Sequence, residues 1–337
     1  MKRKKSKKNK NGFLKVMLAL TAVAIVGTGG FVAYALGLLI EFTENEYYQN
    51  NIILDIGTET TSASNTPIAF THTTYPTETA SPQYLKETAP TYKLNEFLSQ
   101  SRFAHMAVYY HNINTGFVFE HNANRVYFAA SLTKAPFALY IYQKAEAGYT
   151  NLFDYHVFEE DYYATGSGII RNNHGIGTPL TQAQLLGYNL YLSDNVALRM
   201  LRSIHGLDGF YAFVRGLGGD STLIHNITYS RTTAREAGRF AMAMHNYIDS
   251  DGRYSRQFLD HLLNNHYPFI LSNYPVASKT GWWHDFGGAW HDMSIVYAPS
   301  PYVLVVLSNN FGGDDTPLIQ EIAWFIEGFN SHFYPQN

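Results

Sequence analysis

The sequence lacks cysteine entirely, and only 15% of its 337 residues are charged. Without cysteine, neither disulfides nor thiolate metal sites can hold the chain together, which is compatible with export but does not require it. At 46% hydrophobic content, a chain of this length can bury one large core or two modest ones. Stability must therefore come from packing.

Acidic residues are absent before Val16, where eight of the 24 Lys and Arg residues lie. The remainder carries 16 basic against 27 acidic residues, a net charge of about −11. A strongly acidic surface repels phosphate backbones, so this balance argues against nucleic acid as a partner.

The chain has one long apolar run, Val16 to Ile40, which contains no charged residue. Its 25 residues can span a bilayer. The basic cluster before it should stay in the cytoplasm, which places the rest outside the cell. Ala33-Tyr34-Ala35 has the small-x-small form of a signal-peptide cleavage site, so removal after Ala35 is the alternative to an uncleaved anchor.

These compositional changes predict four parts. Residues 1–15 form a basic cytoplasmic segment, residues 16–40 a transmembrane anchor, and residues 41–91 a stalk rich in Ser, Thr and Pro with little apolar periodicity. Residues 92–337 form the folded domain. We find no internal repeat.

Three short motifs in the folded domain suggest chemistry. Ser131 precedes Lys134 by one helical turn, so the lysine side chain can reach the serine hydroxyl and act as the base that a serine nucleophile needs. A helix that begins near Ser131 also directs its positive end at charge developing during attack. Ser193-Asp194-Asn195 and Lys279-Thr280-Gly281 follow in that order. A single Ser-x-x-Lys occurs often by chance, but the ordered set does not.

The set resembles the motifs of class A β-lactamases and penicillin-binding proteins. The resemblance implies a serine acyl enzyme that uses neither a metal nor another cofactor. In it Ser131 is the nucleophile, Lys134 the base, and Lys279 a second cation that also attracts a substrate carboxylate. Ser193 relays a proton to the leaving nitrogen, and Asn195 holds Lys134 or the substrate amide.

The same resemblance implies substrate contacts on the third motif. Thr280 and Gly281 belong to the substrate-binding strand, and the backbone N–H groups of Trp282 and Ser131 form the oxyanion hole. The side chains of Trp282 and Trp283 either line the site or pack. Asp194 is expected to brace its turn, because none of these steps needs a carboxylate there.

One expected residue is missing. Class A β-lactamases place a glutamate on a loop after the second motif, where it activates the water that releases the acyl group. The matching interval here, Gly218 to Arg231, contains no glutamate, and Asp220 is its only acid. Glu236, in the next helix, is interpreted as first-turn charge. We therefore expect acylation to be competent and deacylation to be slow.

The order of elements predicts the fold. Two strand-like runs come first, a helical middle follows, and three strands and a helix close the chain. This is α+β (mixed α/β) and implies the β-lactamase/transpeptidase-like fold, with an antiparallel five-stranded sheet, flanking helices and an inserted helical subdomain. His284-Asp285 and His291-Asp292 flank one predicted hairpin and are expected to be exposed, since no metal-binding spacing is present.

The predicted protein is a membrane-anchored, extracellular serine hydrolase acting on cell-wall D-Ala-D-Ala peptides or β-lactams. Its expected partners are a peptidoglycan stem peptide or a β-lactam, and the membrane through the N-terminal helix. A true class A-like β-lactamase is one alternative, and a non-catalytic β-lactam or peptidoglycan receptor is another. The natural substrate, the acyl acceptor (water or an amine) and the oligomeric state stay open.

Overall fold

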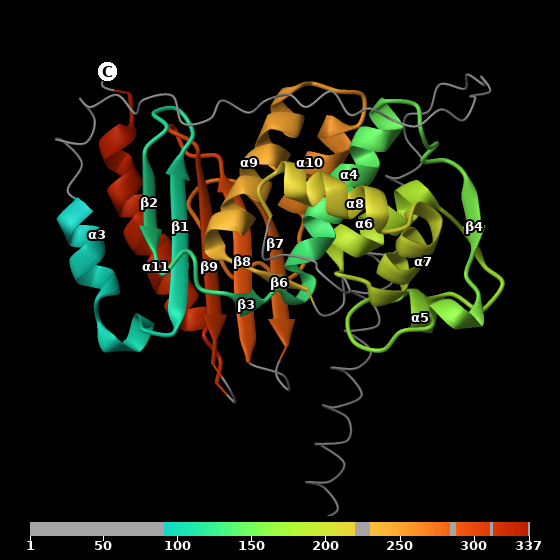
Figure 1. The fold of residues 1–337 in the computed structure, drawn as a ribbon, viewed down its shortest axis with the longest axis horizontal. Coiled ribbons are helices and arrows are strands. Elements are labelled where there is room, and N and C mark those ends of the chain that lie inside the picture. The colour runs from blue at the N-terminus through green and yellow to red at the C-terminus, as the bar shows by residue number, and fades with distance from the viewer. Residues whose placement is uncertain (1–90, 220–229, 284–287, 311–312, 336–337) are drawn as a thin grey trace, which may run out of the picture. The chain divides into compact units, whose positions relative to one another are not determined.

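A five-stranded antiparallel sheet forms the centre of the folded domain (Figure 1), in a computed structural model that describes residues 91–219, 230–283, 288–310 and 313–335. Its strand order is β2-β1-β9-β8-β7, with β1 (Met106–Asn112), β2 (Val118–His121), β7 (Val276–Trp283), β8 (Ala289–Val296) and β9 (Tyr302–Asn309). The sheet thus combines both ends of the described chain, as predicted, and β7 lies at one edge.

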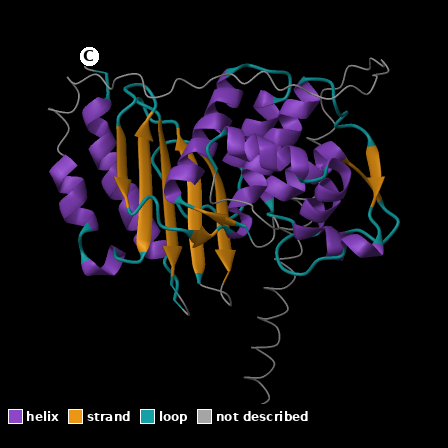
Figure 2. Cartoon of the chain, in the orientation of Figure 1, coloured by secondary structure: helices purple, strands orange, loops and turns teal. Residues whose placement is uncertain are grey.

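The central strands are buried along almost their whole length. Every residue of β8 is buried, and in β9 only Asn309 is not. An antiparallel sheet commonly leaves one face to solvent, but here helices cover both faces (Figure 2). The apolar sequence of β9, Tyr-Val-Leu-Val-Val-Leu, follows from this double cover.

The two faces carry separate cores. On one, α3 (Thr91–Leu98) and α11 (Thr316–Asn330) pack their apolar sides against the sheet, with the rings of Phe97 and Phe325 stacked at a centroid distance of 4.0 Å. The larger core lies on the other face and continues into the helical middle of the chain. The apolar stripe of α11 explains its position, because a surface helix stabilises the fold through one buried face.

Helix α4 (Lys134–Glu146) is the centre of the helical half. Ten of its residues are buried, consistent with its apolar sequence on nearly every side. Around it lie α6 (Gln182–Tyr191), α7 (Asn195–His205), α8 (Asp208–Gly216), α9 (Ala234–Asp249) and α10 (Ser255–Leu263). Helix α6 begins with a capping box, in which Thr181 and Gln184 bond reciprocally.

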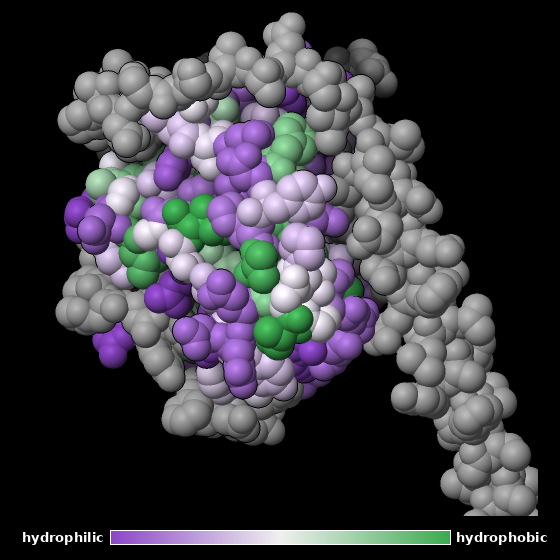
Figure 3. Space-filling view, turned by 90° about the vertical axis from the view of Figure 1, so that its right-hand side faces the viewer, coloured by the Kyte–Doolittle hydropathy of each residue, from purple (hydrophilic) through white to green (hydrophobic). Residues whose placement is uncertain are grey.

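Smaller elements connect these parts. They are β3 (Tyr127–Phe128) paired with β6 (Arg231–Thr232), β4 (Tyr155–Val157) paired with β5 (Pro179–Thr181), and α5 (Ile170–Asn173), together with short 3₁₀ turns. The outer face of the helical half mixes hydrophilic and scattered hydrophobic side chains (Figure 3). The predicted α+β fold with its five-stranded sheet is confirmed.

Some predictions concern residues outside the described ranges. They include the basic segment, the membrane span, nearly all of the stalk, Asp220 and the pair His284-Asp285. In the portion that is described, no helix combines the length and the apolar character needed to cross a bilayer.

One prediction about the β7–β8 hairpin is wrong. His291 and Asp292 are not exposed hairpin residues but fully buried ones in the interior of β8. Asp292 accepts hydrogen bonds from the backbone N–H groups of Phe269 and Ile270, at 2.8 and 2.9 Å. Both side chains are polar yet buried because the surrounding backbone supplies hydrogen-bond partners, which the alternation of polar and apolar residues cannot reveal.

Candidate active site

The first motif lies in a tight turn between β3 and α4. Ser131 belongs to a 3₁₀ turn, Ala130–Thr133, that leads directly into α4 at Lys134. Ala129 donates its N–H to the carbonyl of Ser230 at 2.9 Å, which ties the turn to the β6 side. Ala130, immediately before the serine, has φ of +48°. That conformation costs a non-glycine residue about 1–2 kcal/mol, so surrounding contacts must hold it.

Lys134 is buried, and its side-chain amine contacts the second motif. Its Nζ donates to Ser193 Oγ at 3.1 Å and to Asn195 Oδ1 at 2.8 Å, and it also contacts the Ser193 carbonyl. Burial lowers the pKa of Lys134 well below its usual value, and the positive charge of Lys279 lowers it further, against an opposing effect of Asp194. The lowered pKa favours the neutral amine, which is the form that a general base requires.

The second motif is held rigidly between α6 and α7. Asp194 Oδ1 accepts the N–H groups of Val196 and Ala197 at the start of α7, at 2.8 and 3.0 Å. Its other oxygen accepts those of Ile169 and Ile170, at 2.7 and 2.9 Å. The prediction that Asp194 braces its turn is confirmed, and the carboxylate links the motif to the loop before α5.

The flanking residues of this motif face the site from a constrained backbone. Ser193 has φ of +53°, the second strained non-glycine residue next to the predicted chemistry. Asn195 uses both ends of its amide, accepting from Lys134 and donating to the Thr165 carbonyl at 2.8 Å. At Gly166 an added Cβ would lie 2.7 Å from that amide nitrogen, so the loop can approach Asn195 only as glycine.

The third motif lies on β7. Lys279 and Thr280 are buried, and Lys279 Nζ donates to the Thr280 carbonyl at 3.0 Å. Burial lowers the pKa of Lys279 to about 7, against the opposing negative charge of Asp292.

Gly281 brings β7 against the turn that carries Ser131. An added Cβ at Gly281 would lie 3.0 Å from the backbone nitrogens of Ser131 and Leu132 and from the Ala129 carbonyl oxygen. The absence of a side chain permits this close approach, which places the strand segment before Trp282 beside the Ser131 amide. The two predicted oxyanion-hole donors thus belong to segments in direct contact.

The two tryptophans after this motif combine exposure with packing. Trp282 is 40% exposed and stacks on Trp290, with ring centroids 6.5 Å apart. Trp283 contacts Phe128 edge to face at 5.6 Å, and Phe128 lies two residues before the Ser131 turn. The Trp283 side chain therefore lies near the turn of the predicted nucleophile, whereas Trp282 stacks on Trp290, which belongs to the core on the opposite face of the sheet.

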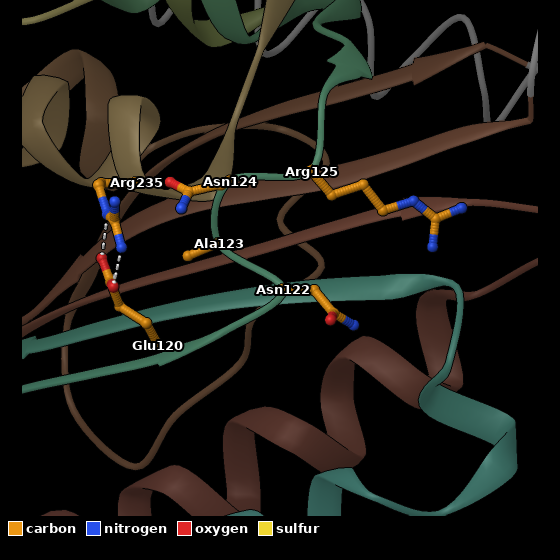
Figure 4. A pocket seen from close by; sticks show the side chains of 6 residues that line it. All are labelled: Glu120, Asn122, Ala123, Asn124, Arg125 and Arg235. Carbon is orange, nitrogen blue, oxygen red and sulfur yellow. Dashed lines mark hydrogen bonds and ion pairs between the residues drawn. The ribbon is translucent and has the colours of Figure 1, made fainter.

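A separate hollow of about 380 Å³ lies at the connection between β2 and β3 (Figure 4). It is lined by Glu120, Asn122, Ala123, Asn124, Arg125 and Arg235. The guanidinium of Arg235 donates to both carboxylate oxygens of Glu120, once at 2.6 Å. None of the predicted site residues lines this hollow.

Among the predicted site residues, Lys134 is hydrogen-bonded to Ser193 and Asn195, and Gly281 lies against the Ser131 turn. Sequence reasoning missed the strain at Ala130 and the contact between His291 and the Phe128 carbonyl, at 2.7 Å. The His-Asp pair of β8 was visible in the sequence, but its pairing opposite Gly281 depends on the sheet register.

Residues 89–326 match the model of the Beta-lactamase enzyme family. The chain belongs to that family. Its fold is that of the β-lactamase/transpeptidase-like serine hydrolases, as the resemblance of the three motifs predicts. A comparison with curated proteins gives no match.

Solved structures share this fold at low sequence identity. A point mutant of PBP-A, described as an acyl-enzyme complex with penicillin G, is 18% identical, with a TM-score of 0.64 over 72% of this chain and 97% of its own. A β-lactamase from Sphaerobacter thermophilus is 21% identical, with a TM-score of 0.61 over 68% and 92%. A β-lactamase from Chitinophaga pinensis is 20% identical, with a TM-score of 0.63 over 71% and 98%.

Proposed function

We propose that this chain is a membrane-anchored, extracellular serine enzyme that forms an acyl enzyme with D-Ala-D-Ala peptides or β-lactams and releases the acyl group slowly. The observation that carries the proposal is the environment of Lys134. It is a buried amine with a lowered pKa, one turn after Ser131, hydrogen-bonded to Ser193 and Asn195. A buried lysine without a catalytic or structural use is costly, and a lysine one turn after Ser131 fits the base that a serine nucleophile needs.

Acylation begins when Ser131 Oγ attacks the carbonyl carbon and passes its proton to the neutral amine of Lys134. The carbonyl oxygen becomes an oxyanion, which the N–H groups of Ser131 and Trp282 stabilise. The C–N bond then breaks, and the nitrogen receives a proton through Ser193, whose hydroxyl lies 3.1 Å from Lys134 Nζ. The products are a serine ester and an amine, which departs from a D-Ala-D-Ala peptide but stays attached to the acyl group of an opened β-lactam.

Lys279 and Thr280 recognise the substrate carboxylate in this scheme. Lys279 supplies positive charge and Thr280 a hydroxyl donor from the same buried strand. Both D-Ala-D-Ala peptides and penicillins carry a carboxylate close to the scissile amide, so one pair of residues serves both substrate classes.

Slow deacylation follows from the missing carboxylate. The sequence between Gly218 and Arg231 holds no glutamate. Glu236 is buried in the first turn of α9, with its N–H capped by Thr233 Oγ1 at 3.1 Å, which fits a structural position. Loss of a positioned general base typically costs about 10²–10⁴-fold in rate. The penicillin G acyl enzyme described for PBP-A supports the same substrate chemistry.

The decisive experiment is labelling of the full chain with a fluorescent penicillin. We expect one equivalent to bind covalently, Ser131→Ala to abolish labelling, and Ser203→Ala, an equivalent change on α7, to leave it intact. Stopped-flow absorbance should show a burst of one equivalent and then a nearly flat phase. Undiminished labelling of Ser131→Ala would refute the proposal, and a fast linear phase would identify a true β-lactamase instead.

The anchored topology is tested separately. The basic cluster before Val16 should keep the N-terminus in the cytoplasm, so protease added to intact protoplasts should remove the folded domain. A cytoplasmic marker protein must survive the same treatment. Complete protection of the domain would contradict the predicted orientation.

A further inference from the structure

His291 occupies an unusual position for a buried polar side chain. It lies in the middle of β8, fully buried, and pairs across the sheet with Gly281 of the third motif. Cross-strand partners point to the same face, so the imidazole lies on the side of the sheet where Gly281 meets the Ser131 turn. Its Nε2 is 2.7 Å from the carbonyl oxygen of Phe128, three residues before Ser131.

The contacts of the ring determine which nitrogen carries the proton. Burial lowers the pKa of His291 to about 4, so the ring is neutral at physiological pH and holds one proton. Nδ1 lies 3.2 Å from the N–H of Ser308, which can only donate, and 2.8 Å from the carbonyl of Trp290, which can only accept. A proton on Nε2 satisfies the Phe128 and Ser308 contacts, whereas a proton on Nδ1 satisfies only the Trp290 contact. The geometry therefore favours the Nε2–H tautomer.

The hydrogen bond between His291 and the Phe128 carbonyl can control the position of the Ser131 nucleophile. Phe128 ends β3, and the strained Ala130 lies two residues further on, directly before Ser131. On one side the turn is tied to Ser230 through the Ala129 N–H. On the other side, His291 supplies a donor, and Gly281 removes the Cβ that would otherwise hold the strand away.

We propose that His291 is a positioning residue for acylation: its Nε2–H donates to the Phe128 carbonyl and holds the strained turn that presents the Ser131 hydroxyl and amide. This rests on the proposed function. Without the bond, Ala130 can relax from φ of +48°, and Ser131 leaves its attacking position while the substrate-binding strand keeps its own structure. Misplacement of a reacting group by about 1 Å can cost on the order of 100-fold in rate.

Three variants of the full chain test the role. The Gln side chain can place its NH₂ group near the Nε2 position, Asn reaches only about as far as Nδ1, and Leu offers no donor. We expect His291→Gln to keep the acylation rate constant within about threefold, and His291→Asn and His291→Leu to lower it about 10- to 100-fold. The dissociation constant for penicillin should stay unchanged in all three, as stopped-flow titration measures.

Two further measurements separate positioning from folding. The thermal unfolding midpoints of His291→Asn and His291→Gln should fall by similar amounts. Only His291→Asn should also show a lower acylation rate constant. ¹⁵N-histidine NMR of the wild-type chain should show His291 protonated at Nε2, a signature that requires no folded variant. A wild-type Nδ1–H tautomer, or His291→Leu acylating at the wild-type rate, overturns the positioning role alone. A wild-type chain that takes up no penicillin overturns the proposed function, and the kinetic role with it.

Discussion

The helical half and the sheet half of the domain each contribute one buried lysine. The hydrogen-bond partners and the neighbouring charges of these two lysines differ. Lys134, at the start of α4, donates to Ser193 and Asn195, while the carboxylate of Asp194 between them is occupied by four backbone N–H groups. Lys279, on β7, donates to the Thr280 carbonyl; burial lowers its pKa, and the carboxylate of Asp292 opposes that shift.

This difference fits the different tasks proposed for the two amines. Around Lys134 the acceptors are neutral, and the positive charge of Lys279 disfavours protonation, so Lys134 is suited to take up a proton. Lys279 titrates near pH 7 and has a carboxylate on the neighbouring strand, so it can remain charged and attract an anion. Burial alone would make both lysines alike, and the neighbouring charges make them different.

The largest expected effect comes from removing the base. Lys134→Met keeps the length of the side chain and removes the amine, so we expect the acylation rate to fall about 10²–10⁴-fold while penicillin affinity changes little. Stopped-flow labelling measures both. Lys144→Met, on the same helix and away from the motifs, is the matched control and should acylate normally. Equal losses in the two variants would mean that the helix, not the base, is responsible.

The sequence predicts the site residues, including both lysines, but it does not predict how the surroundings of the two lysines differ. Ser131, Lys134, Ser193, Asn195 and Lys279 are recognisable because their spacing is local and their residue types are specific. The five-stranded sheet follows from apolar runs in the right order, and it is confirmed.

What the sequence does not reveal depends on contacts between distant segments. The two-residue pair of β3 with β6 is too short to give a periodic signal, yet it positions the Ser131 turn. Asp292 looks like a hairpin residue until the sheet register buries it next to Thr280, with donors from residues 269 and 270. The pKa difference between the two lysines likewise depends on the three-dimensional placement of charges.

A smaller effect concerns stability and Asp292. Burial raises the pKa of Asp292 to about 6 from its ordinary 3.8, so the folded state holds a proton that the unfolded chain releases between these pH values. This contribution is complete below pH 3.8 and is lost as pH rises through 6. We expect the free energy of unfolding from this group to fall by about 3 kcal/mol at most across that window.

The variant Asp292→Asn tests whether Asp292 causes this pH dependence of the free energy of unfolding. The Asn oxygen can accept the Phe269 and Ile270 N–H groups, and its NH₂ group can meet Ser294 Oγ, so the fold should be kept while the titration is removed. Urea unfolding at several pH values should show a flatter profile in the variant between about pH 4 and 6. An identical slope in both chains would exclude Asp292 as its source. The variant should also lower the pKa of Lys279, because it removes the negative charge that raises it.

The smallest expected effect concerns how Lys279 recognises an anion. Its pKa of about 7 lies below that of the unfolded chain, 10.5, so the folded protein loses this positive charge as pH rises above 7. Affinity for benzylpenicillin, an anion, should then weaken by up to about tenfold per pH unit, because binding requires the protonated amine. The dissociation constant from stopped-flow acylation measures this, and a penicillin methyl ester, which carries no charge, serves as the control. The bound anion raises the pKa of the lysine in the complex, which extends the fall to higher pH without moving its onset, so the comparison of the two ligands is diagnostic. Equal pH dependence for acid and ester would show that Lys279 does not hold the carboxylate, and the contrast between the two lysines would then rest on Lys134 alone.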